Sequence, residues 1–75
     1  MHTAEWLSTA ADELGVAAPA DHADLLDLTR EVAHAVERLA GPLTLFMLGQ
    51  AVGAGGDQDE LIARLRRALS AAARR

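Results

Sequence analysis

The segment from Leu43 to Ala54, LTLFMLGQAVGA, is apolar almost all the way round when it is drawn as a helix. A helix without a polar face must be covered on most sides by other parts of a protein. The uncharged stretch 39–56 around it contains Pro42, Gln50 and five glycines, so it offers no continuous apolar span of about 20 residues. We therefore predict a helix at the centre of a small bundle and no membrane crossing.

Apolar residues recur at helical spacing on both sides of this segment, and no segment alternates as a strand does. The predicted helices span about residues 4–14, 22–39, 43–54 and 58–72. Thr3 and Asp21 are suitable N-caps for the first two helices, and Gly15 suits the left-handed position that ends the first. The 75 residues make one domain, 1–75. The predicted fold class is all-α, a compact bundle of four helices with helix three central.

Several residues are predicted to have structural roles. Pro42 can occupy the first position of the third helix, where its missing amide hydrogen is not needed. Gly49 and Gly53 form a G-x-x-x-G pattern, which lets another helix backbone approach closely, and we expect tight packing there within the bundle. Trp6 and Phe46, the two aromatic residues, are also predicted to be structural.

Composition excludes several classes of function. Seven arginines against eleven acidic residues give a net charge of −4, so nucleic acid is not expected as a partner. Without cysteine there is no thiol nucleophile and no cysteine metal site, and the histidines lack metal-ligand spacing. No nucleophile, base and orienting group can be named together, so we predict no catalytic residues, no cofactor and no enzymatic activity. The acidic N-terminus does not look like a signal peptide, so we expect a cytoplasmic protein.

Resemblance in size and acidity to an acyl carrier protein fails at one position. A carrier holds its prosthetic arm on a serine at the start of the second helix, where this sequence reads ADHADLLDL. The carrier function is therefore not predicted.

The segment REVAHAVER places Arg30, His34 and Arg38 four residues apart on the side of the second helix opposite its apolar stripe. One interpretation is a solvated face with ion pairs such as that between Asp27 and Arg30. A second is a docking surface for a protein partner. A third is an anion site, in which Arg38, His34, Thr44 and the amides at the start of the third helix converge. The sequence leaves these three interpretations open.

The stretch LLDLTREVAHAVERLAGPLTLFMLGQAVG resembles a small helical family of actinobacteria. Its members carry a pattern close to L-L-D-L-A-R-[DE]-x-A-H-x-V-x-R-x-x-[AG]-P-L-T-x-F-L-x-G, and the similarity covers about residues 5–53. The shared residues are Asp27, Arg30, His34, Arg38, Pro42, Thr44, Phe46 and Gly49. Some members are fused to, or associated with, the guanylyltransferase that makes molybdopterin-guanine dinucleotide. The resemblance implies that the polar residues are family features and that the chain is linked to molybdenum-cofactor biosynthesis.

We therefore predict a non-enzymatic accessory module that binds a protein partner. The resemblance makes the molybdenum-cofactor nucleotidyltransferase the first candidate, with other cytoplasmic proteins after it. One alternative is a module that binds a small anion or nucleotide at the junction of the second and third helices. Another is a structural bundle that forms a homo-oligomer through the Gly49/Gly53 face or exposed leucines of the fourth helix.

Overall fold

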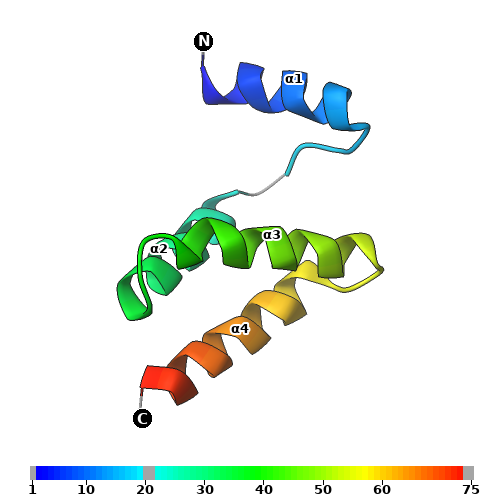
Figure 1. Ribbon diagram of the computed structural model, residues 1–75. Coiled ribbons are helices and arrows are strands. Elements are labelled where there is room, and N and C mark those ends of the chain that lie inside the picture. Colours follow the sequence, from blue (N-terminus) through cyan, green and yellow to red (C-terminus); the bar gives the residue numbers. More distant parts are fainter. Residues whose placement is uncertain (1, 20–21, 74–75) are drawn as a thin grey trace.

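The protein is described by a computed structural model that covers residues 2–19 and 22–73 (Figure 1). Its helices are α1 (Thr3–Leu14), α2 (Ala23–Ala35), α3 (Ala40–Gly53) and α4 (Gln58–Ala73). No strand occurs within these described ranges. The all-α class and the four-helix content predicted from the sequence are confirmed.

The hydrophobic core lies between α2, α3 and α4, which pack against one another pairwise. Leu28 and Val32 of α2, Leu48 of α3 and Ile62 of α4 are buried. Half-buried apolar side chains surround these four: Leu25, Ala40, Leu45, Val52, Leu61, Leu65 and Leu69. Helix α3 contacts both α2 and α4, which is consistent with its predicted central position. The prediction that it is covered on most sides is wrong, because Leu43, Phe46 and Met47 are exposed.

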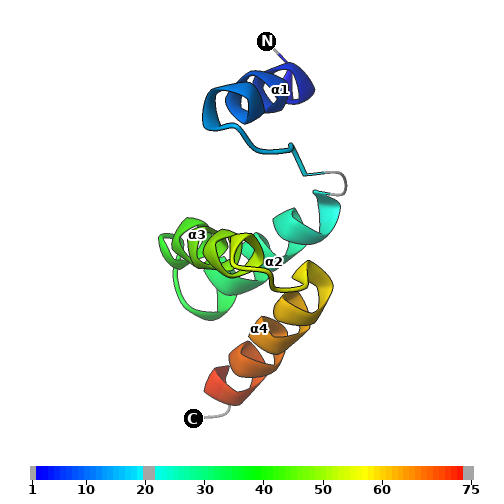
Figure 2. The ribbon, with the colours of Figure 1, turned by 90° about the vertical axis from the view of Figure 1, so that its right-hand side faces the viewer.

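Helix α1 stands away from the other three helices in both views (Figures 1 and 2). It has no buried residue and no close backbone contact with another helix in the described part of the chain. Leu7 lines an apolar pocket together with Leu25 and Leu45, but the side chains of Trp6 and Leu14 are 56% and 74% exposed. The packed unit is therefore formed by α2, α3 and α4.

The N-terminal end of α1 differs from the prediction, and its C-terminal end agrees with it. His2, and not Thr3, is the N-cap, and its amide donates a hydrogen bond to Oε1 of Glu5 at 3.2 Å. Gly15 adopts the predicted left-handed conformation with φ 68°, and the Val16 amide donates to the Ala11 carbonyl at 3.0 Å. This is a Schellman ending. The predicted N-cap Asp21 of the second helix lies outside the described residues.

The boundary between α2 and α3 is the main correction to the predicted helix ranges. Helix α2 ends at Ala35, not at residue 39, because Val36 leaves the helical conformation with φ −115° and ψ −83°. Helix α3 begins at Ala40, so Pro42 is its third residue and not its first. The first turn still tolerates proline, since amides there have no intrahelical acceptor. The apolar stripe of α2 consequently ends at the turn, and Val36 and Leu39 are exposed.

Gly41 provides a physical reason for the early start of α3. It is buried against α2, where a Cβ atom on Gly41 would lie 3.0 Å from Cγ2 and 3.1 Å from the carbonyl oxygen of Thr29. A Cβ atom on Gly49 or Gly53 would meet nothing within 4 Å. The close helix approach predicted at Gly49 and Gly53 is therefore absent from the described chain, and it occurs at Gly41 instead.

Candidate functional site

The row of polar residues predicted along the second helix, Arg30, His34 and Arg38, is here called the polar ladder, and on α2 it is shorter than predicted. Nη2 of Arg30 lies 2.9 Å from Oδ1 of Asp27, so the expected ion pair is confirmed, and both side chains are exposed. Arg38 lies beyond the end of α2, in the turn that leads to α3. The helix therefore carries Arg30 and His34 but does not extend the ladder to Arg38.

The residues predicted to surround an anion are distributed over different places. His34 lines a groove between α2 and α4 with Glu31 and Arg66. Thr44 lines a different groove, between α3 and α4, whose walls are mostly apolar. Arg38 lines neither groove. The start of α3 offers few donors, because Pro42 has no amide hydrogen and the Ala40 amide donates to the Glu37 carbonyl at 3.0 Å.

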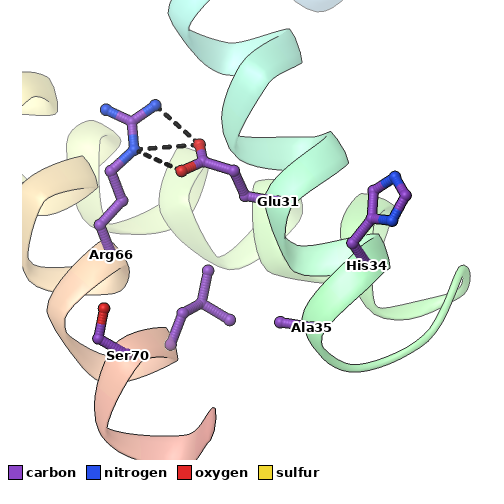
Figure 3. Close-up of a pocket in the computed structure, with 6 residues that line it drawn as sticks. Glu31, His34, Ala35, Arg66 and Ser70 are labelled. Carbon is purple, nitrogen blue, oxygen red and sulfur yellow. Dashed lines mark hydrogen bonds and ion pairs between the residues drawn. The ribbon is translucent and has the colours of Figure 1, made fainter.

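The groove between α2 and α4 contains a bidentate ion pair (Figure 3). Nε and Nη2 of Arg66 donate to the Glu31 carboxylate at distances of 2.9–3.2 Å, and Nη2 also donates to Oδ1 of Asp24 at 3.2 Å. These hydrogen bonds, the one to Glu31 first, raise the pKa of Arg66. Figure 3 shows Arg66 turned toward Glu31, with His34 on the far side and pointing away.

Two carboxylates therefore surround the single guanidinium of Arg66. They neutralise its charge and would repel an incoming anion, so this arrangement serves best to hold α4 against α2. The sequence interpretation missed Arg66. A signal was present, because Asp24 and Glu31 are seven residues apart and so share one side of α2, where one arginine can bridge them.

No group of three or more histidine, aspartate or glutamate side chains among the described residues is arranged to hold a metal ion. None of the described helices combines the length and the apolar character that crossing a membrane requires.

One side of α3 is apolar and yet is not covered by any other described part of the chain. We define this side, the α3 face, by Leu39, which directly precedes the helix, and by Leu43, Phe46, Met47, Gln50 and Gly53 of the helix itself. Each of its four large side chains is 58–71% exposed. Helix α3 itself contains no charged residue.

The positions of the α3 face have a regular spacing. Steps of four, three, four and three residues lead from Leu39 to Gly53, with Met47 beside this line. This is the heptad spacing with which one helix packs lengthwise against another. Contiguous exposed apolar patches of this kind mark interaction sites on soluble proteins. The α3 face therefore combines exposure with the spacing of a helix-packing surface.

Comparison with known proteins places the chain in a family. The model of a family described as "Domain of unknown function (DUF6457)" matches residues 1–75. Neither the curated proteins nor the solved structures contain a match to the chain.

Proposed function

The chain belongs to the DUF6457 family, and we propose that it is a non-enzymatic protein-interaction module whose contact surface is the α3 face. The exposure of this face is the observation that supports the proposal. Four large apolar side chains stand in water on a helix whose other side forms the core. Solvation of such a patch is unfavourable, and a partner that removes it from water gains the hydrophobic free energy.

The proposal moves the contact surface from the polar side of α2 to α3. On α2, Asp27 satisfies Arg30, and Arg66 engages Glu31. Exposed ion pairs of this kind contribute little to affinity, whereas apolar and aromatic anchors such as Phe46 contribute most of the energy of an interface. Phe46 is one of the residues that carry the family resemblance.

The pathway belongs to the same proposal. The association with molybdopterin-guanine dinucleotide biosynthesis, implied by the resemblance to an actinobacterial family, makes the guanylyltransferase the first protein to test. The module would then act in the cytoplasm as an accessory to that enzyme.

Amide NMR spectra of the labelled chain, recorded as the guanylyltransferase is added, test the proposal. We expect shifts or broadening at Leu43, Phe46 and Met47, and loss of binding in Phe46→Ser. Leu14→Ser is the matched control, because Leu14 is equally exposed but lies on α1. Perturbation confined to Arg30 and His34 would assign docking to the α2 side and contradict the proposal.

The same spectra test the small-anion alternative. Phosphate and magnesium-GTP are added separately, and the amides of His34, Arg38 and Thr44 are followed. Because these residues do not share one site, we expect no saturable set of shifts common to all three. Saturable shifts that disappear in Arg38→Ala would favour a ligand-binding function instead.

A further inference from the structure

We propose that the occupant of the α3 face is a second copy of this chain, packed antiparallel about a two-fold axis close to Phe46. This inference rests on the proposed function, because it names the partner of the same surface. It is supported by the order of side-chain sizes along α3, by the absence of charge and by the amount of surface that the chain leaves exposed.

The two ends of the α3 face differ in side-chain size, because it begins with leucine and ends with glycine. Leu39 directly precedes the helix, Leu43 lies in its N-terminal half, Phe46 lies in the middle, and Gln50 and Gly53 lie in its C-terminal half. Residue 46 is midway between residues 39 and 53. An antiparallel copy therefore sets Leu39 of one chain opposite Gly53 of the other, at both ends of the contact. Large residues then face small ones, which is how well-packed layers fill space.

A parallel copy fits the face poorly. It would set Leu39 against Leu39 at one end and Gly53 against Gly53 at the other, so the second end would contain a void. It would also align the two helix dipoles, whereas the antiparallel arrangement opposes them. The difference in side-chain size between the two ends and the helix dipoles both favour the antiparallel orientation.

The charge distribution also suits a symmetric contact. A two-fold axis brings the same surface of each copy together, so a charge close to the axis would meet its own image. Helix α3 has none, although the chain as a whole carries a net charge of −4. The α3 face can therefore meet its copy without repulsion between like charges.

The chain exposes more surface than a compact monomer of its size would. The chain has an accessible surface of 5813 Å², whereas a compact monomer of its mass, 7.9 kDa, is expected to have roughly 4,400 Å². The excess of about 1,400 Å² exceeds the roughly 800 Å² that each partner contributes to an interface of standard size. Part of the excess belongs to α1, and the α3 face supplies a further part.

Sedimentation velocity of the full chain, from micromolar to millimolar concentration, tests the inference. We expect a concentration-dependent species of about twice 7.9 kDa. Gly53→Leu should weaken dimerisation at least about tenfold, since the new side chain meets Leu39 of the other copy. Both positions are exposed in the single chain, so the fold should persist, and helix content measured by circular dichroism checks this.

Mixing two variants tests the antiparallel register directly. Leu39→Ala alone leaves voids at both ends of a homodimer, and Gly53→Leu alone produces clashes at both ends. A mixture of the two allows one heterodimer in which leucine faces alanine at one end and glycine faces leucine at the other. We expect this mixture to dimerise more strongly than either variant alone, whereas Leu14→Ala should change nothing.

Three outcomes would overturn the inference. A dimer that persists in Gly53→Leu would use a different surface. If mixing Leu39→Ala with Gly53→Leu did not restore dimerisation, the antiparallel register would be excluded. A chain that stays monomeric at millimolar concentration would leave the α3 face to another occupant. In that last case Phe46→Ser, tested in the binding experiment above, decides the proposed function independently: loss of binding retains it, and unchanged binding rejects it.

Discussion

Substitution of Gly41 by alanine should destabilise the protein, although alanine is the better helix former. The added Cβ atom would lie 3.0 Å from Cγ2 of Thr29, whereas carbon atoms pack best at about 3.5–4.0 Å. Thr29 cannot easily rotate away, because its hydroxyl donates to the Leu25 carbonyl at 2.8 Å. The first turn of α3 must therefore move away from α2, which loosens the packing next to Leu28 and Val32.

The magnitude follows from two opposing effects. Overpacking of this kind costs about 1–3 kcal/mol. Replacing glycine by alanine in a helix returns up to about 1 kcal/mol, and less in the first turn. We expect a net loss of about 1–2 kcal/mol, which corresponds to a decrease in Tm of roughly 4–16 °C for a domain of this size.

Gly49→Ala is the matched control, because it makes the same chemical change in the same helix. A Cβ atom on Gly49 meets nothing within 4 Å, so only the gain in helix propensity remains, about 0.5–1 kcal/mol. Urea and thermal unfolding of both variants are followed by far-ultraviolet circular dichroism at dilute protein concentration. A Gly41→Ala variant as stable as the parent would refute the close approach of α3 to Thr29. Adding Thr29→Ser, which removes Cγ2, should recover part of the loss in a double-mutant cycle.

Two further predictions concern the core and the ion pair between α2 and α4. Leu28 is completely buried, so Leu28→Ala should cost about 2–5 kcal/mol, whereas Leu26→Ala at an exposed position should cost little; equal losses in urea unfolding would place the core elsewhere. Arg66→Met should lower Tm more than Arg64→Met, because Arg66 binds two carboxylates of α2 whereas Arg64 pairs with Glu60 of its own helix. That difference should shrink in high salt, and a difference independent of salt would contradict an electrostatic origin. Arginine is charged throughout the neutral range, and because the pKa of Arg66 is raised further, its contribution is retained there and is lost as the pH rises through that raised pKa.

The sequence predicted the helices better than their boundaries. Amphipathic spacing identified all four segments, and the predicted end of α1 at Gly15 is confirmed. Helix α2 ends at Ala35 without a glycine or proline nearby, so no local signal marks that end. The cause is tertiary, because Gly41 must lie against Thr29, and such a contact between separate helices is invisible to periodicity.

In the candidate site, too, contacts within one helix could be predicted from the sequence, and contacts between helices could not. The local ion pair of Asp27 with Arg30 follows from helical spacing and was predicted. The position of Arg38 depends on where α2 ends, and the bond of Arg66 to Glu31 joins residues 35 apart in the chain. The first depends on the packing of α3 against α2 and the second on the packing of α4 against α2, and neither follows from helical spacing.

Glycine use along α3 gives a separate argument for an external partner. Each glycine inside a helix costs about 0.5–1 kcal/mol relative to alanine. At Gly41 this cost is offset by close packing, since a side chain there would collide with Thr29. Gly49 and Gly53 have no such reason within the described chain, because open space surrounds both. Their cost is offset only if another surface packs where a side chain would otherwise stand. Gly49→Ala should therefore stabilise the isolated chain and weaken dimerisation at the same time; a variant that is more stable and still dimerises normally would show that no partner approaches α3 at Gly49.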